Sequence, residues 1–354
     1  MSKNKSSDDS RFEPDFEAYG KAFDKSFERE SEKFEEIKKQ KLIMALYGSV
    51  NSGKSSTINA LTGQPLASVK AVAGWNKEVM LYPFGKDVYI SDTPGLEDID
   101  EENSARATEF VEKDADIILF LFNAGVGASK STVDAYEELQ RLDKPIIVVL
   151  NKIDMLHINE QEEMEKDIKE KTGARVVPIS ARDNRGVDVL HRNILEILEF
   201  QGKDLLYLKV SKFKDEQVDR WITGATISAA GIAAIPIPGA DIFPLTALQA
   251  GLAMKIAFIY ECEVTKKDVM QLVAATVTGS VGRQIFRLGI QGLKAAGLLG
   301  GPLVGAAMAI AAGVAASVTY GFGHACKAYY KSGMTLELDG VVEIFRNMSK
   351  QYKI

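Results

Sequence analysis

Gly48-Ser-Val-Asn-Ser-Gly53-Lys54-Ser55 constrains the fold of this 354-residue chain more narrowly than any other part of the sequence. Its glycines and its lysine-serine pair are spaced as in a phosphate-binding loop, between a predicted strand over 42–48 and a predicted helix over 54–62. The glycines let the backbone wrap closely, so that its N–H groups and the helix N-terminus face phosphate oxygens. Lys54 is expected to reach the outer phosphates, and Ser55 to place its hydroxyl on Mg²⁺. The expected contacts are Gly48, Asn51, Ser52, Gly53, Lys54, Ser55 and Ser56.

Short apolar runs alternate with amphipathic stretches around this loop. Strands are expected at 42–48, 87–92, 115–122, 144–150 and 174–180, and helices at 54–62, 104–113, 130–142, 159–171 and 187–200. Such alternation predicts an α/β domain with a mainly parallel sheet that helices cover on both faces. A further apolar run over 79–84 lies one short turn before Asp87. We expect it to form a hairpin that adds one antiparallel edge strand.

Asp92-Thr93-Pro94-Gly95 follows the strand predicted at 87–92. At the carboxyl end of that strand, Asp92 can hold the Mg²⁺ shell, usually through water. The Gly95 N–H can contact the terminal phosphate and sense its loss. The predicted metal ligands are therefore Ser55 and Asp92.

Asn151-Lys152-Ile153-Asp154 follows the strand predicted at 144–150. A guanine presents N1–H and N2–H₂ donors on one edge, and the carboxylate of Asp154 would accept both while repelling the lone pair of adenine. Asn151 is expected to serve the other edge of the base and to tether the loop, and the Lys152 stem to cover the ring. This pattern favours guanine over adenine.

Ser180-Ala181-Arg182 stands after the last predicted strand. There the Ala181 N–H is expected to reach the guanine oxygen. The order of the four motifs and their places at strand ends agree with a single nucleotide site at the carboxyl edge of a parallel sheet.

Residues 41–200 resemble a translation-factor-class small GTPase domain, closest to the Era and TrmE-like group, whose loop often reads GxxNxGKS as it does here. The resemblance implies a GTP-hydrolysing switch with GTP or GDP and Mg²⁺ as cofactors. It also implies that Asn51 helps to bind a K⁺ ion beside the phosphates. Lys54, Asn51 and Gly95 are the residues expected to act in catalysis.

Two departures bear on hydrolysis. Leu96 follows the Asp92-to-Gly95 motif where Ras-like proteins carry a water-orienting glutamine. The attacking water then needs another donor, namely backbone, K⁺ or a residue supplied in trans by self-association. No threonine occurs between Thr62 and Thr93, although the family usually places a Mg²⁺-binding threonine in switch I, near Gly74 here. Slow or assembly-stimulated hydrolysis follows, and a non-catalytic GTP-binding interaction module is an alternative.

The composition changes in the second half of the chain. Ile222–Ala240 and Ala295–Cys326 contain no Lys, Arg, Asp or Glu, and small residues are frequent. Helices are expected over about 222–235, 244–261 and 303–323. Pro236, Pro238 and Gly239 would turn the chain between the first two, and Asp241 would cap the second. This motif resembles the domain of unknown function in YcjF-like bacterial membrane proteins, over about residues 220–330.

Three interpretations of the uncharged helices stay open. The stretch 295–323 exceeds the ~20 residues that cross a bilayer, and Gly297, Gly301 and Gly305 have small-xxx-small spacing. A buried core of a compact bundle fits the same residues, as does a hairpin released in one nucleotide state. The expected partners besides guanine nucleotide are a membrane surface or membrane protein, and a homodimer or GTP-dependent oligomer.

An aromatic stripe marks the start of the chain, at Phe12, Phe16, Tyr19, Phe23, Phe27, Phe34 and Ile37. The spacing predicts an amphipathic helix packed on the rest of the chain, and a partner-binding helix is the alternative. Four segments result: a polar start and this helix (1–40), the GTPase domain (41–202), a hydrophobic helical domain (203–333) and an amphipathic tail (334–354). The layout is similar to that of immunity-related GTPases.

The composition excludes several classes of protein. A net charge of −6 offers no basic field, so nucleic acid is not expected as a partner, and a soluble Era-like ribosome assembly factor is the second choice. Two cysteines and three scattered histidines make neither a disulfide framework nor a metal cluster. Without an apolar leader, the expected location is the cytoplasm, or the inner face of a membrane.

Overall fold

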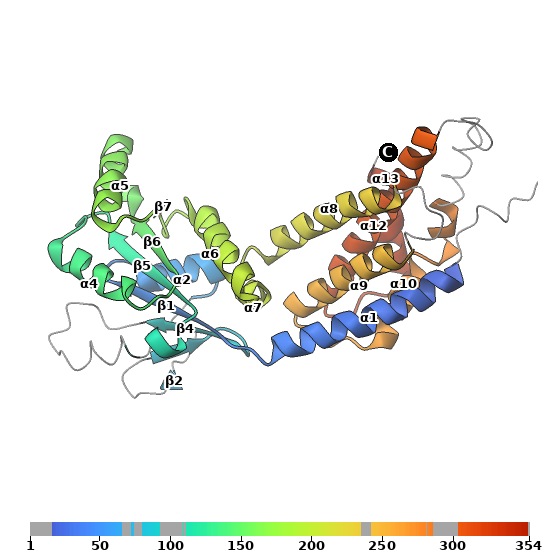
Figure 1. The fold of residues 1–354 in the computed structure, drawn as a ribbon, viewed down its shortest axis with the longest axis horizontal. Helices are drawn as coiled ribbons and strands as arrows, with labels where there is room; N and C mark the ends of the chain where they lie inside the picture. The colour runs from blue at the N-terminus through green and yellow to red at the C-terminus, as the bar shows by residue number, and fades with distance from the viewer. Residues whose placement is uncertain are drawn as a thin grey trace, which may run out of the picture. The chain divides into compact units, whose positions relative to one another are not determined.

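A computed structural model describes residues 16–65, 72–73, 80–92, 109, 111–234, 242–280, 282–285 and 304–352. The chain forms two compact units (Figure 1). The sheet unit comprises residues 37–214, and the helical unit combines residues 1–36 with 215–354. The division thus falls after Glu36 and Lys214, whereas the sequence pattern suggested breaks after residues 40 and 202.

The described part of the sheet unit holds a seven-stranded sheet in the order β2-β3-β4-β1-β5-β6-β7. Its strands are β1 (Leu42–Gly48), β2 (Val72–Ala73), β3 (Met80–Pro83), β4 (Val88–Asp92), β5 (Ile117–Asn123), β6 (Ile146–Asn151) and β7 (Val176–Ile179). β4, β1, β5, β6 and β7 pair in parallel, which confirms the mainly parallel α/β sheet. β3 forms the expected antiparallel hairpin with β4.

The expectation of one antiparallel edge strand is wrong in one respect. β2 pairs with the outer side of β3, so that β2 is the edge and two strands are antiparallel. A two-residue strand is too short to leave an alternating pattern in the sequence.

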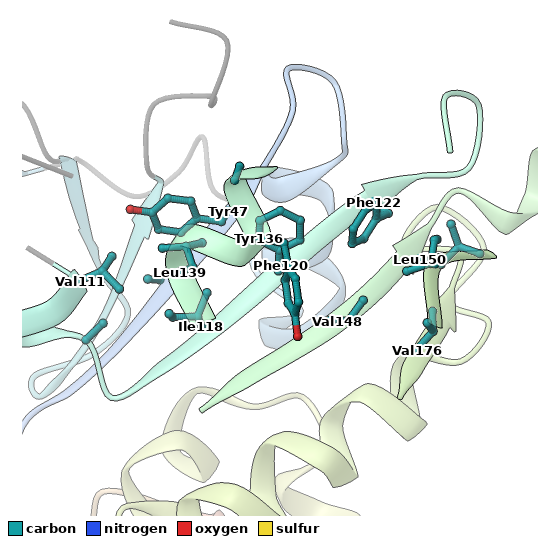
Figure 2. Close-up of a cluster of buried hydrophobic side chains, with 14 of the residues drawn as sticks. Tyr47, Val111, Ile118, Phe120, Phe122, Tyr136, Leu139, Val148, Leu150 and Val176 are labelled. Carbon is teal, nitrogen blue, oxygen red and sulfur yellow. The ribbon is translucent and has the colours of Figure 1, made fainter. Parts of the chain in front are cut away.

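The helices of the sheet unit are α2 (Lys54–Thr62), α4 (Lys130–Gln140), α5 (Ile158–Thr172), α6 (Val187–Gln201) and α7 (Asp204–Val210). Of the helix expected at 104–113, residues 109 and 111–113 are described and helical. Alternate residues of β1, β5 and β6 build a buried cluster with α4 (Figure 2). Within it the Phe120 ring meets the Tyr136 ring edge-on, with centroids 5.4 Å apart. This packing fixes the strand ends from which the site residues emerge.

α7 was not expected from the sequence, and it explains why the sheet unit extends to Lys214. The Tyr207 hydroxyl lies 3.1 Å from His191 Nδ1 on α6, and Lys209 pairs with Asp87 at 3.3 Å. The N–H of Lys212 donates to the Leu61 carbonyl at the end of α2, at 3.1 Å. These contacts bind the segment after α6 to the sheet.

The helical unit contains α1 (Phe16–Lys38), α8 (Lys214–Ala233), α9 (Ile242–Ile259), α10 (Lys266–Ala275), α12 (Val304–Lys331) and α13 (Leu338–Gln351). α1 packs into it through its aromatic stripe. The Phe23 ring meets Phe322 at 6.4 Å, and the Phe34 ring meets Phe258 at 5.6 Å. The N-terminal helix therefore lies on the chain's own body, as the first of the two interpretations held.

The expected amphipathic tail contains α13, which packs along α12. The Ser317 hydroxyl donates to the Ser349 carbonyl at 2.7 Å, and the close approach of the two helices leaves no room for a Cβ at Gly321. Pro236, Pro238, Gly239 and Asp241, together with Gly297 and Gly301, lie outside the described residues.

One described helix segment, Met308–Lys331 in α12, has the length and composition to cross a bilayer. Within its most apolar 18-residue window, 61% is buried inside the protein, and the core helix of a soluble protein meets the same criteria of length and composition. The segment therefore fits both a core helix and a membrane span.

Candidate nucleotide-binding site

The loop between β1 and α2 has the backbone of a phosphate cradle. Gly48 has φ +151° and Gly53 has φ +91°, values that L side chains rarely adopt. A Cβ at Gly48 would lie 2.5 Å from the Leu121 carbonyl oxygen, and one at Gly53 would lie 2.2 Å from Asn151 Nδ2. Asn51 is also left-handed (φ +64°), which asparagine tolerates better than most residues. The glycines are therefore required by both conformation and space.

Lys54 and Ser52 complete the loop. The Lys54 ammonium donates to the carbonyl oxygens of Gly48 and Ser49 at 3.0 and 3.4 Å, and so bridges the loop from the start of α2. The Ser52 hydroxyl is buried and has no hydrogen-bond partner among the described residues. N–H groups in the first turn of α2 have no partner within the helix. A polyanion matches this donor set.

Asn123 is a site residue that the motif analysis missed. It ends β5, and its Nδ2 donates to the Asn51 carbonyl at 3.1 Å. Its Oδ1 accepts the N–H of Gly125 at 2.9 Å. One side chain thus ties the phosphate loop to the turn after β5. The signal was a polar residue that closes a fully buried strand, at the edge where parallel sheets bind ligands.

Asn151 ties two further segments together. It is buried, its Nδ2 donates to the Ser52 carbonyl at 2.9 Å, and its Oδ1 accepts the N–H of Ala181 at 3.2 Å. These two hydrogen bonds are of the kind that we expected Asn151 to make as a tether of the loop. Both its amide atoms and the Ala181 N–H are engaged within the protein, although we expected Asn151 and Ala181 to contact the base.

Asp154 stands in the predicted base-reading corner. The Ser180 hydroxyl donates to Asp154 Oδ1 at 2.8 Å and accepts the N–H of Asp183 at 3.1 Å, which orients the carboxylate. Asp154 Oδ2 lies 3.9 Å from the exposed guanidinium of Arg182. Lys152 is left-handed (φ +69°), and its stem passes 3.8 Å from the Cβ position of Gly53. The base-reading and phosphate-loop residues therefore meet at one edge of the sheet.

The predicted magnesium ligands can be placed only in part. Ser55 and Ser56 lie in the first turn of α2 and are exposed. Asp92 is the last residue of β4 and pairs in register with Leu46 of β1, so that its backbone ends beside the phosphate loop. The Asp92 side chain, together with Gly95 and Leu96, lies outside the described residues. Among the described residues, no cluster of three His, Cys, Asp or Glu forms a separate metal site.

Two family models match this chain. Residues 43–152 match the family described as 50S ribosome-binding GTPase, and residues 203–353 match DUF697, a domain of unknown function. The second match covers α7 to α13 and extends at both ends beyond residues 220–330, over which the sequence resembles the YcjF-type domain.

Three curated relatives match about half of the chain. GTPase Era of Halothermothrix orenii is 29% identical over 48% of this chain and 61% of its own length. tRNA modification GTPase MnmE of Chromobacterium violaceum is 32% identical over 48% of this chain and 37% of its own. GTPase Der of Nautilia profundicola is 33% identical over 49% of this chain and 38% of its own.

The chain thus spans less than two thirds of each of these relatives, and the similarity covers about half of the chain. The phosphate loop and Asn151-Lys152 of the base-reading motif fall inside residues 43–152, the region that the GTPase family model matches. This chain joins a P-loop GTPase domain of the 50S ribosome-binding GTPase family, homologous to those of Era, Der and MnmE, to a C-terminal domain of the DUF697 family.

Proposed function

We propose that this protein binds GTP and hydrolyses it to GDP, and that the nucleotide state controls how the helical unit engages a membrane or a second copy. The observation that carries the nucleotide proposal is the pair of asparagine tethers. Asn123 and Asn151 hold the phosphate loop against the turn after β5 and the Ala181 loop. Residues more than 100 positions apart are thereby held in one site (Ser52 and Ala181).

The roles of the side chains follow from their chemistry. Lys54 and the N–H groups at the start of α2 would neutralise phosphate charge, and Asp154, oriented by Ser180, would accept the guanine donors. Ser55 and Asp92 would hold Mg²⁺, which supplies charge neutralisation at the phosphates when bound. The Lys54 ammonium would leave the Gly48 carbonyl for a phosphate oxygen, a stronger acceptor.

Water positioning is the step for which this chain offers the fewest residues. Leu96 brings no polar group, so that the donor is expected from Gly95, from a K⁺ ion held beside Asn51, or from a second copy. Hydrolysis should therefore be slow for the isolated protein and faster in K⁺ or on assembly. The proposed location is the cytoplasm, with association at the inner face of a membrane.

A second function is favoured by the family description and by one relative's name. The family is described as 50S ribosome-binding, and MnmE as a tRNA modification GTPase. Ribosomal or transfer RNA is therefore a candidate partner, against the expectation from the net charge of −6. RNA that copurifies with the protein and stays bound during washes at moderate salt would favour this alternative.

Binding of fluorescent GDP, GTP and ATP analogues, followed by turnover in K⁺ and in Na⁺, tests the proposal. We expect guanine nucleotides to bind and adenine nucleotides to fail, with faster phosphate release in K⁺. Equal binding of ATP would contradict the base-reading role of Asp154. Guanine binding without turnover in either salt, at any protein concentration, would identify a non-catalytic module.

A further inference from the structure

Charge is segregated along the three apolar helices of the helical unit. In α8 the charged side chains lie in the first two turns, and none follows Arg220. In α12 there is no Lys, Arg, Asp or Glu before Lys327, and in α9 Lys255 is the only charged residue. Each helix therefore has a charged end and an uncharged end.

The three charged ends lie together. Lys327 donates to Asp219 at 2.6 Å, and Lys331 pairs with Asp215. The Tyr260 hydroxyl, just after α9, donates to Asp215 at 2.6 Å. α8 thus runs antiparallel to α12, and α9 runs parallel to it. As a consequence, the C-terminal end of α8 and the N-terminal ends of α9 and α12 lie at the same end of the unit.

The charged helices α1 and α13 do not extend along this uncharged end in the described part of the chain. α13 ends at Gln351, beside the turn of α12 that contains Ser317. The described part of α1 begins at Phe16, one turn before Tyr19, whose hydroxyl bonds Gln249 of α9. Gln249 in turn donates to Thr319, at the same level of α12, at 2.9 Å.

In the described residues the uncharged end has an apolar or small surface. Its most exposed large side chain is Ile227 on α8, which is 64% exposed, and Gly224 and Gly231 flank it with open space. On α12, Ala311 is exposed. The buried hydroxyl of Thr226 donates to the Ile222 carbonyl at 2.7 Å, so that this polar group is satisfied within its own helix.

Aromatic and basic side chains mark the boundary between the two ends. The Lys255 ammonium lies 5.2 Å from the centre of the Trp221 ring, and the Tyr320 ring contacts the Tyr352 ring in a tilted arrangement with centroids 5.2 Å apart. Trp, Tyr and Lys are the residues that gather where a membrane meets water. From Ser317 to Val304, α12 extends by about 20 Å, comparable to the ~15 Å hydrocarbon depth of one leaflet.

We propose that the end of the helical unit formed by α8 after Ile222, the start of α9 and α12 before Ser317 inserts into one leaflet of a lipid bilayer. The inference deepens the membrane arm of the proposed function and rests on it. The occupant is lipid rather than a second copy, because the aromatic boundary and the insertion depth both match a leaflet.

The test compares single lysine substitutions in the full-length protein. Ile227→Lys and Ala311→Lys place a charge in the uncharged end, and Phe200→Lys places one at a side chain that is 90% exposed on α6. Flotation with phosphatidylcholine vesicles that contain one third phosphatidylglycerol, with GTP, GDP and no nucleotide, measures binding. We expect both substitutions in the helical unit to weaken partitioning about tenfold or more, and Phe200→Lys to leave it unchanged.

Three results would overturn the inference. The first is that the wild-type protein does not float with vesicles in any nucleotide state. The second is vesicle binding that about 1 M salt abolishes and that the lysine substitutions do not change. The third is the formation of oligomers without lipid that the lysine substitutions dissociate. Thermal melting shows whether each variant folds, and the two positions give independent readings. GDP affinity, measured on the same samples, separates the proposals. Loss of flotation with intact GDP binding counts against the membrane site alone, and flotation without GDP binding counts against the GTPase proposal.

Discussion

Substituting Asn123 by alanine is expected to weaken nucleotide binding although Asn123 lies in none of the sequence motifs. The change removes two hydrogen bonds, from Nδ2 to the Asn51 carbonyl (3.1 Å) and from the Gly125 N–H to Oδ1 (2.9 Å). Each is worth about 0.5–1.5 kcal/mol. If both are needed to hold the phosphate loop in its binding conformation, the total of about 1–3 kcal/mol corresponds to roughly a 5- to 150-fold loss of affinity.

Fluorescent GDP titration of Asn123→Ala measures this loss, and urea unfolding shows whether the sheet unit remains folded. Asn123→Asp keeps the acceptor for Gly125 but faces the Asn51 carbonyl with a carboxylate, so it should lose at least as much affinity. Asn193→Ala removes an amide whose hydrogen bond, within the described part of the chain, stays in its own helix, to the Val189 carbonyl at 2.8 Å, and should leave affinity unchanged. A folded Asn123→Ala protein with wild-type GDP affinity would refute the tethering argument.

Four further predictions concern other residues. Asp154→Asn should lower GDP affinity by about tenfold or more and raise affinity for xanthosine diphosphate, whose extra carbonyl suits a carboxamide donor; unchanged discrimination in competition titrations would contradict the base assignment. Lys54→Ala should abolish nucleotide binding in calorimetry while circular dichroism stays native, because its bonds within the loop are replaceable but its charge is not. Phe120→Ala should destabilise the sheet unit by about 3–5 kcal/mol in urea unfolding, since the ring is fully buried against Tyr136. Burial alone would raise the pKa of Asp215, but hydrogen bonds from Lys331 and Tyr260 outweigh burial and lower that pKa below 3.8. The ionised Asp215 therefore stabilises the fold above about pH 4, and this contribution is lost as the pH falls further. On acidification, the melting temperature of Asp215→Asn should fall less than that of the wild type.

The sequence allowed the sheet and its order of elements to be predicted closely. β1 and α2 begin and end where the pattern placed them, because apolar runs give way at once to loop glycines. α7 could not be foreseen, since its seven residues are buried on nearly all sides and show no periodicity. The partner of α1 was also out of reach, because a stripe of aromatic rings says which face is buried and not what covers it.

The site shows the same limit. Motif spacing brought the phosphate loop and the Asp154 corner to one edge of the sheet. It could not show that the side-chain amide of Asn151 hydrogen-bonds two backbone segments, because those bonds depend on the three-dimensional distance between Ser52 and Ala181. Asn123 escaped notice for a related reason, since one polar residue at a strand end is common and gains meaning only beside Asn51.

The division of the chain into units has a consequence for the order of folding during synthesis. The helical unit is assembled from the first 36 residues and from those after 214, so the whole sheet unit is made in between. Phe23 is fully buried, yet its partner Phe322 leaves the ribosome about 300 residues later, roughly 15–60 seconds at the usual rates of elongation. During that interval the apolar face of the first helix lacks the residues against which it packs in the folded protein. The nascent chain must therefore expose an apolar surface while its nucleotide-binding domain is already able to fold.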